Sequence, residues 1–388
     1  MKAALQIRGI NMDPPLLAAV IALMVLGTIM VSSASISLAD REMGEPFFFL
    51  GRHFGAIAIG CVGALMAVAI PTELWFRLNW LLLLAAMALL VSVLLPSIGH
   101  TVNGSARWID VGPITLQPSE PARLCMILYL SGYVVRHREE LSQSVIGFLK
   151  PTLVVTLACV ALLAEPDFGA AVVLTATSLG MLFVGGARLR DFCLSFLAAS
   201  AALVALALSS SYRLQRLTTF LDPWADPYAS GFQLTQSLIA IGRGDWFGVG
   251  LGDSVQKLFY LPEAHTDFVF AVLAEELGFA GVTLVVVLFA TVVFRALSLG
   301  LRAGALGLPF QGLVSTGIGL TLGLQAFVNM GVNVGLLPTK GLTLPLISYG
   351  RTSVVITLVS LGLLLRIHHE VHEAGRRAEA RERGRRRS

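Results

Sequence analysis

The sequence predicts an all-α polytopic membrane protein with about ten transmembrane helices, both termini in the cytoplasm and a large extracytoplasmic loop between helices 7 and 8. Hydrophobic residues make up 55% of the 388 residues, and the mean hydropathy is +0.78. Charged residues make up only 13%, against roughly 25% in soluble domains. A soluble globular enzyme is excluded, because its surface would need more polar residues than this chain has.

Charge-free runs define half of the predicted spans, since a transmembrane helix needs about 20 apolar residues. These runs are 14–39, 53–72, 78–95, 168–187 and 192–212. The other predicted spans are shorter, or contain or adjoin charges, and they cover 119–135, 150–164, 265–294, 309–331 and 354–365. The four cysteines lie in apolar stretches as small hydrophobic residues, so we expect no disulfide framework.

Basic residues indicate the orientation, because Lys and Arg collect in cytoplasmic loops. The alternate segments that include both chain ends are richer in Lys and Arg than the others. We therefore expect a cytoplasmic N-terminus at 1–13, a ten-helix membrane domain at 14–368 with an extracytoplasmic loop at about 211–266, and a basic cytoplasmic tail at 369–388.

The basic tail accounts for the whole net charge of +4, because the chain from Arg366 onward has eight Arg and four Glu. Such a segment is typical of a solvated anchor near anionic membrane lipids. The alternative is a docking site for a cytoplasmic partner. We expect no nucleic-acid partner.

Unusual polar residues collect in four segments that are predicted to lie on the extracytoplasmic side, at 103–120, 165–169, 211–267 and 333–353. Long loops are uncommon and usually functional. We therefore expect the active surface to face the outer leaflet, with these segments around one groove.

The first of these segments is expected to form two short extended pieces joined by a turn at 111–113, followed by a helix that Ser119 caps. Glu120 and Arg123 are three residues apart on this helix, so they share a face and can pair. The pair is either an internal ion pair between helices or a polar wall of the groove.

The second segment places Glu165 and Asp167 within an apolar run, where acidic groups are costly and usually functional. The alternative for Asp167 is that it caps the helix that follows.

The long loop contains Gln233, Gln236 and Ser237, two glycine clusters and Lys257. Glycines let backbone amides approach a ligand closely, and basic side chains can hold a diphosphate through charge-assisted hydrogen bonds. The alternative for the basic residues is loop packing and contact with lipid headgroups.

Asp267 lies at the outer mouth of the eighth predicted span, where a carboxylate can act as a general base if its pKa suits proton transfer. The helix N-terminus would lower that pKa and partial burial would raise it. The alternative is that Thr266 or Asp267 caps the helix. Glu275 and Glu276 lie about 12–14 Å deeper, so we expect a structural or gating pair with a buried partner.

The last polar segment, 333–353, is rich in Gly and Pro. Irregular backbone at membrane depth must be covered by protein or line a cavity, so we expect a re-entrant loop beside the same groove. Lys340 is a candidate anion contact or, alternatively, an interfacial residue whose charge reaches water.

Several of these motifs occur together and in this order in one known family. The chain resembles the SEDS family of shape, elongation, division and sporulation proteins over essentially its full set of spans. The matching motifs are NGSARWI (103–109), QPSE (117–120), the Gln233/Gln236/Ser237 and Gly242/Gly244 cluster, QKLFYLPEAHTDFVFAV (256–272) and PTKGLTLPLISYG (338–350). The segments PTKGLTLP and PEAHTDF favour the cell-division branch over the elongation branch.

The resemblance implies a peptidoglycan glycosyltransferase of the bacterial inner membrane, acting at the division septum. It implies that lipid II is polymerised into β-1,4 glycan with release of undecaprenyl diphosphate, and that Asp267 activates the acceptor 4-hydroxyl for an inverting attack. The implied partners are lipid II and nascent glycan, a class B penicillin-binding transpeptidase with other division proteins, and membrane lipids. No cofactor is certain, and a divalent cation is left open.

Two positions depart from the family pattern. The family usually has Lys where Arg123 stands, which keeps the charge but replaces a point contact with a planar fork. Arg351 follows Gly350 where the family has a second Gly, and this adds a charge on the outer side.

We therefore assign Asp267 as the catalytic residue and assign no metal ligand. The residues expected to bind substrate are Arg107, Glu120, Arg123, Gln233, Gln236, Ser237, Lys257, His265, Lys340 and Ser348. One alternative function is a flippase or transporter of the lipid-linked precursor, which would suit ten spans and intramembrane acids. Another is a scaffold that recruits division partners through its basic tail.

Overall fold

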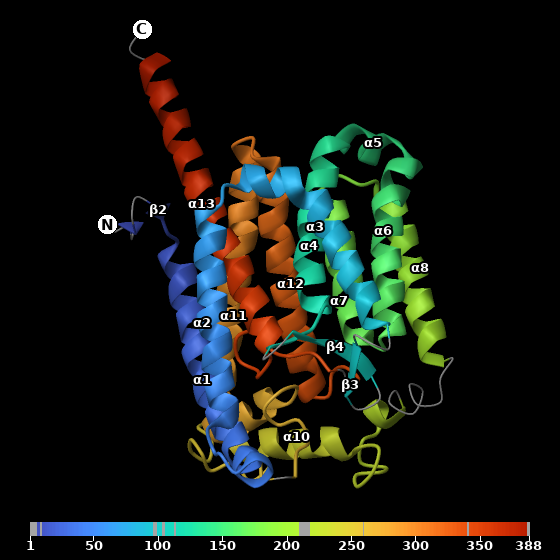
Figure 1. Cartoon of the computed structure of the whole chain (residues 1–388), viewed down its shortest axis with the longest axis vertical. Helices are drawn as coiled ribbons and strands as arrows, with labels where there is room; N and C mark the ends of the chain where they lie inside the picture. The colour runs from blue at the N-terminus through green and yellow to red at the C-terminus, as the bar shows by residue number, and fades with distance from the viewer. Residues whose placement is uncertain are drawn as a thin grey trace.

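The computed structural model is mainly helical and describes residues 6–7, 10–95, 99–102, 105–111, 114–208, 218–258, 260–339 and 341–385. Long helices run side by side, and β2 and the end of α13 lie toward one end of the bundle while α10 crosses the other (Figure 1). The helices are α1 (Pro14–Met43), α2 (Phe48–Ala69), α3 (Thr72–Val93), α4 (Ser119–Arg136), α5 (Arg138–Gln143), α6 (Val145–Ala164), α7 (Phe168–Val184), α8 (Leu189–Leu208), α10 (Phe232–Gly244), α11 (Val269–Ala305), α12 (Pro309–Asn333) and α13 (Arg351–Arg385).

Each predicted span overlaps one of these helices, and the predicted all-α membrane class is confirmed. Within the described residues, α1, α2, α3, α6, α11, α12 and α13 are long and apolar enough to cross a membrane. The ends of the observed helices differ from those of the predicted spans where a charged residue lies inside a helix. For example, α6 begins at Val145 instead of 150, because Ser144 caps it and Lys150 reaches Glu140 at 2.5 Å.

Helix α13 extends into the basic tail that we expect from residue 369. The helix continues through Arg385, and its residues 376–383 are exposed. The helix begins toward the end of the bundle that α10 crosses (Figure 1), where the Arg351 guanidinium donates to the Thr115 hydroxyl at 2.6 Å. One helix therefore connects the two ends of the bundle.

The two extended pieces predicted before α4 form strands, and a third strand that was not predicted pairs with them in an antiparallel sheet. Its strands, in spatial order, are β3 (Gly99–Val102), β4 (Ser105–Val111) and β5 (Ile114–Leu116). Residues 112 and 113 of the turn predicted at 111–113 lie outside the described part of the chain. Strands β1 (Gln6–Ile7) and β2 (Ile10–Asn11) form a small antiparallel pair.

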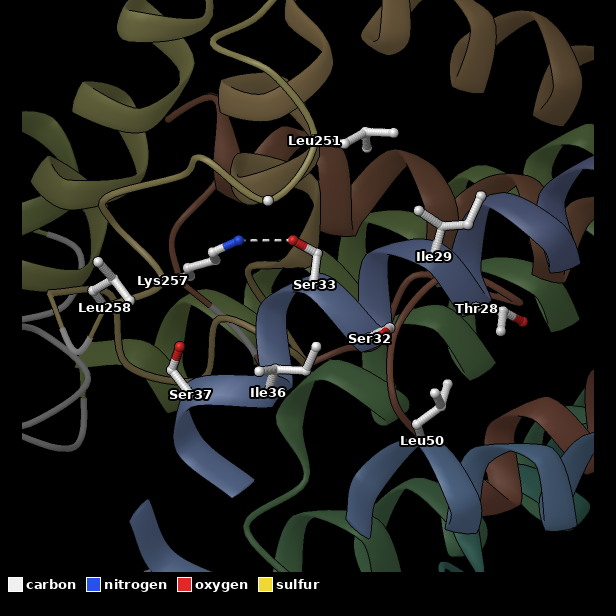
Figure 2. A pocket seen from close by; sticks show the side chains of 11 residues that line it. Thr28, Ile29, Ser32, Ser33, Ile36, Ser37, Leu50, Leu251, Lys257 and Leu258 are labelled. Carbon is white, nitrogen blue, oxygen red and sulfur yellow. Dashed lines mark hydrogen bonds between the residues drawn. The ribbon is translucent and has the colours of Figure 1, made fainter. Parts of the chain in front are cut away.

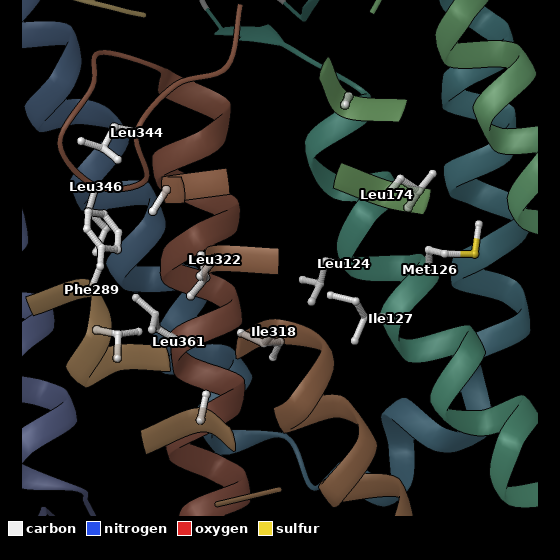
Figure 3. Packing of buried hydrophobic residues seen from close by; sticks show 14 of the residues in the cluster. Leu124, Met126, Ile127, Leu174, Phe289, Ile318, Leu322, Leu344, Leu346 and Leu361 are labelled. Atoms are coloured by element: carbon white, nitrogen blue, oxygen red, sulfur yellow. The ribbon is translucent and has the colours of Figure 1, made fainter. Parts of the chain in front are cut away.

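Apolar packing joins α4 and α12 at the centre of the bundle. Figure 3 shows Leu124 and Ile127 of α4 on the side that faces Ile318 and Leu322 of α12, and all four are buried. Large apolar side chains on the outward faces are exposed instead, as at Leu65 of α2. Such exposure suits a protein surrounded by lipid.

Helix α11 is broken at Gly278, whose φ of 65° and ψ of −163° leave the helical region. The loop after α10 fills the break through backbone hydrogen bonds. The amides of Phe279 and Ala280 donate to the carbonyls of Asp245 and Trp246 at 2.8 and 3.1 Å. In the other direction, Val249 N donates to the Glu275 carbonyl at 3.0 Å.

The side chains of Glu275 and Glu276 point from this break into the same loop. Glu275 accepts from Arg243 at 3.0 Å, from the Ser254 hydroxyl at 2.5 Å and from the Val255 amide at 3.1 Å. A buried carboxylate with this many donors stabilises the loop. The expectation that these glutamates have a buried partner is confirmed.

Glu276 is paired with Lys257. The Lys257 ammonium lies 2.7 Å from Glu276 Oε1 and 2.8 Å from Ser33 Oγ on α1. Figure 2 shows Lys257 pointing toward Ser33 at the wall of a cavity of about 560 Å³ between α1, α2 and residues 251–258. The charge of Lys257 is thus neutralised within the protein.

One glycine of each cluster packs against α11. A Cβ on Gly244 would overlap the Ala274 carbonyl oxygen, and a Cβ on Gly248 would overlap the Glu276 carbonyl oxygen. These two glycines therefore approach the backbone of α11. They let the loop pack directly on the broken helix.

We expect Gly244→Ala to destabilise the protein by about 1–3 kcal/mol, because the added methyl group overlaps backbone that cannot move alone. Gly242→Ala is the matched control on the same helix, since nothing lies within 4 Å of its Cβ position. The control should be neutral or stabilising by up to about 1 kcal/mol. Thermal unfolding in detergent measures both, and equal midpoints for the two variants would contradict this packing.

Candidate active site

Asp267 lies just before α11, toward the end of the bundle that α10 crosses (Figure 1), and is half-buried. The N-cap residue of α11 is Phe268, which provides no side-chain cap, and the Thr266 hydroxyl donates to Glu263 Oε2 at 2.8 Å. The alternative that Thr266 or Asp267 is the cap residue of this helix is therefore wrong. Asp267 is positioned by contacts of its backbone.

Two of three amide side chains in a row on α12 hold this backbone in place. Gln325, Asn329 and Asn333, which we call the amide row, are buried and spaced four residues apart on one face. Asn329 and Asn333 each donate from Nδ2 to the Asp267 carbonyl, at 2.9 and 3.0 Å. Asn333 Oδ1 also accepts from the Ala271 amide at 3.1 Å.

The same row fixes the segment between α12 and α13. Asn329 donates to the Leu342 carbonyl at 2.6 Å, and Gln325 donates to the Thr343 carbonyl at 3.0 Å. The predicted re-entrant segment is covered by protein, with Leu344 and Ile347 buried. The amide row was not among the predicted site residues. Its spacing of four on an apolar helix is the signal that could have identified it.

Arg107 of β4 lies beside Asp267. A Cβ built on Gly341 would be 3.2 Å from Asp267 Oδ2 and 3.8 Å from Arg107 Nη1. The other guanidinium nitrogens of Arg107 donate to the carbonyls of Glu165, at 3.2 Å, and Pro166. The structure thus places a carboxylate and a guanidinium from distant segments around one glycine.

Glu120 and Arg123 form a buried ion pair on the first turns of α4. Arg123 also donates to Gln325 Oε1 at 2.8 Å, so the pair is linked to the amide row. Ser119 is not the cap, contrary to expectation: the helix begins at Ser119 itself, and Pro118 is the N-cap. The pair therefore joins helices in the core.

The turn between α6 and α7 contains both acids of the second polar segment. Asp167 caps α7, because its Oδ1 accepts from the Ala170 amide at 3.1 Å. Glu165 is 1% exposed, and neither of its carboxyl oxygens has a hydrogen-bond partner. Burial and, to a smaller extent, the Asp167 charge together raise the pKa of Glu165 to about 8, against the opposing effect of Arg107.

His265 is buried two residues before Asp267, against aromatic rings. Its ring centroid lies 4.9 Å from that of Phe49 and 5.7 Å from that of Tyr349. The Tyr349 amide donates to the His265 carbonyl at 2.9 Å. Burial lowers the pKa of His265, although the charges of Glu263 and Glu42 oppose this effect.

The remaining predicted residues differ in their surroundings. Ser237 is buried and donates to the Asn333 carbonyl at 2.8 Å, while Gln233 and Gln236 are half-buried on α10. Ser348 Oγ accepts from the Leu344 amide at 2.8 Å. Lys340 lies outside the described residues.

Acidic side chains do not assemble a metal site in the part of the chain that the structure describes. No group of three or more His, Cys, Asp or Glu residues there lies close enough to hold an ion. We therefore derive no step through a divalent cation.

Known proteins resemble the chain over most of its length. The FtsW/RodA/SpoVE family model, described as a cell cycle protein, matches residues 15–373. A probable peptidoglycan glycosyltransferase FtsW of Thioalkalivibrio sulfidiphilus is 53% identical over 365 residues, covering 94% of this chain and 91% of that protein. Its counterpart in Nitrosococcus halophilus is 54% identical over 358 residues, covering 92% of each.

A solved structure also matches, from work on the structural coordination of polymerization and crosslinking by a peptidoglycan synthase complex. It is 30% identical, has a TM-score of 0.73 and covers 93% of this chain and 98% of that chain.

We expect Asn333→Ala to loosen the backbone around Asp267, because the variant removes one of the two amide donors to the Asp267 carbonyl and the side-chain acceptor of the Ala271 amide. Losing these buried hydrogen bonds lowers the free energy of local opening by about 1–3 kcal/mol, which makes local hydrogen exchange roughly tenfold faster. Deuterium uptake of a peptide covering 265–271 measures this. Gln311→Ala, which removes contacts to Thr72 and Glu370 from α12, is the control and should leave that peptide unchanged. Unchanged uptake in Asn333→Ala would contradict the role of the amide row.

Proposed function

This chain belongs to the FtsW/RodA/SpoVE family of cell cycle proteins, and on this premise we propose that it is a membrane peptidoglycan glycosyltransferase. It polymerises lipid II into β-1,4 glycan strands and releases undecaprenyl diphosphate during septal wall synthesis. Relatives about 50% identical over most of the chain are named for this activity and for the cell-division branch.

The observation that best supports this proposal is the convergence of Asp267 and Arg107 beside Gly341 at the outer end of the bundle. A lipid-linked substrate in the outer leaflet presents its diphosphate and sugars at this level. The proposed chemistry needs a base for a hydroxyl and a cation for a leaving diphosphate. Both kinds of group lie side by side here.

In the proposed reaction, the Asp267 carboxylate takes the proton from the acceptor 4-hydroxyl. The acceptor oxygen forms a bond to the donor anomeric carbon, and the bond from that carbon to the diphosphate oxygen breaks with inversion. A guanidinium such as that of Arg107 would bind the developing diphosphate charge through paired hydrogen bonds.

We propose two roles for the other predicted substrate-binding residues: direct contact with substrate and support of the site. Gln233, Gln236 and Lys340 are proposed substrate contacts. Six others act mainly by supporting the site, since their polar groups contact the protein itself or lie buried: Glu120, Arg123, Ser237, Lys257, His265 and Ser348.

The proposed setting is the bacterial inner membrane at the division septum, with a class B penicillin-binding transpeptidase as partner. A similar solved chain comes from work on a peptidoglycan synthase complex in which polymerization and crosslinking are coordinated. A joint assembly would couple strand synthesis to crosslinking.

We expect Asp267→Asn to reduce polymerisation of lipid II by about 10²–10⁴-fold, the typical contribution of a general base. Purified protein with its transpeptidase partner is incubated with lipid II, and glycan length is read on a gel. The matched control is Asp222→Asn, an exposed aspartate of the same outer loop, which should polymerise at the wild-type rate. A parallel sample with EDTA measures any need for a divalent cation.

Full polymerisation by folded Asp267→Asn protein would remove the general-base assignment. A different outcome would overturn the function itself: wild-type protein that moves lipid II across vesicles but never polymerises it would be a flippase.

A further inference from the structure

Glu165 is a buried acid with no role in the mechanism above. Its side chain lies in the turn between α6 and α7, 1% exposed, and both carboxyl oxygens lack a hydrogen-bond partner. Burying an ionised carboxylate without a donor is strongly unfavourable. The charged groups that face it are the Asp167 carboxylate of the same turn and the Arg107 guanidinium of β4. The environment therefore favours the neutral acid near pH 7.

The backbone of the same turn holds Arg107. The Arg107 Nε donates to the Glu165 carbonyl at 3.2 Å, and Nη2 donates to the Pro166 carbonyl. The remaining nitrogen, Nη1, faces Gly341 next to Asp267 Oδ2. Arg107 thus lies between the Glu165 turn on one side and the Asp267 carboxylate on the other.

We propose that protonated Glu165 is a positioning residue, which leaves Arg107 bound to the turn carbonyls and facing Asp267, and that ionised Glu165 draws Arg107 away. A carboxylate is a stronger acceptor for guanidinium than a peptide carbonyl. An ionised Glu165 carboxylate inside the protein therefore competes with the carbonyls of the turn for the Arg107 guanidinium. The proton on Glu165 controls whether the cation stays beside Asp267. This inference rests on the proposed glycosyltransferase function.

The test compares the pH dependence of polymerisation in wild type and Glu165→Gln. With a pKa of about 8, the protonated fraction of Glu165 falls about tenfold between pH 7 and pH 9, and wild-type polymerisation should fall with it. Glutamine is neutral at every pH, so the ratio of rates at pH 9 and pH 7 should be several-fold higher in the variant. Glu45→Gln, an exposed glutamate on the outer side, is the control and should keep the wild-type ratio.

Equal pH 9 to pH 7 ratios in wild type and Glu165→Gln would overturn the inference while leaving the proposed function intact. Absence of polymer from wild type at every pH would instead overturn the function. The two failures are therefore distinguishable.

A spectroscopic measurement on wild-type protein does not depend on how the variant folds. Infrared difference spectroscopy should show a protonated-carboxyl band that disappears with a midpoint near 8 and is missing in Glu165→Gln, or in Glu165→Met if the first variant does not fold. A midpoint near the ordinary glutamate value of about 4.3 would contradict the proposal.

Discussion

The site depends on the amide row of α12, because three buried side chains join the backbones that bring its chemical groups together. Asn329 and Asn333 bind the Asp267 carbonyl, while Asn329 and Gln325 bind the segment after α12. Irregular backbone at membrane depth has no water to bond with, so each of its polar groups needs a protein partner. Carboxamides suit this task, because each offers donors and an acceptor without bringing a charge into the interior.

The loop before Asp267 meets the same requirement with charged pairs. Two adjacent glutamates at the break in α11 bind Arg243 and Lys257, and the glycines of the loop allow its backbone to reach the break. Removing one partner of such a buried pair would leave an uncompensated charge, which is far more costly than the pair is worth. The paired charges of this region thus determine the shape of the loop before Asp267.

Composition and charge placement were enough to predict the membrane fold, because charge-free runs and basic loops follow directly from the physics of the bilayer. Partners for Glu275 and Glu276 were also predictable, since buried acids must be paired. The roles of Lys257 and the glycine clusters were not, because both depend on contacts with α11 and α1 that no local pattern encodes. Arg107 and Asp267 meet only through tertiary packing, so spacing along the chain could not predict their proximity.

The hydrogen bonds of the amide row also fix when the site can form during synthesis. The Asp267 carbonyl is synthesised before its donors Asn329 and Asn333, which are 62 and 66 residues further along the chain. The acceptors that the amide row binds after α12 are synthesised later still. Chains are made from the N-terminus at about 5–20 residues per second. For several seconds, therefore, the newly inserted helices expose Asp267 without its supports. A nascent chain interrupted before α12 would contain the proposed catalytic aspartate and every predicted contact up to His265, yet would lack the whole amide row that holds the site together.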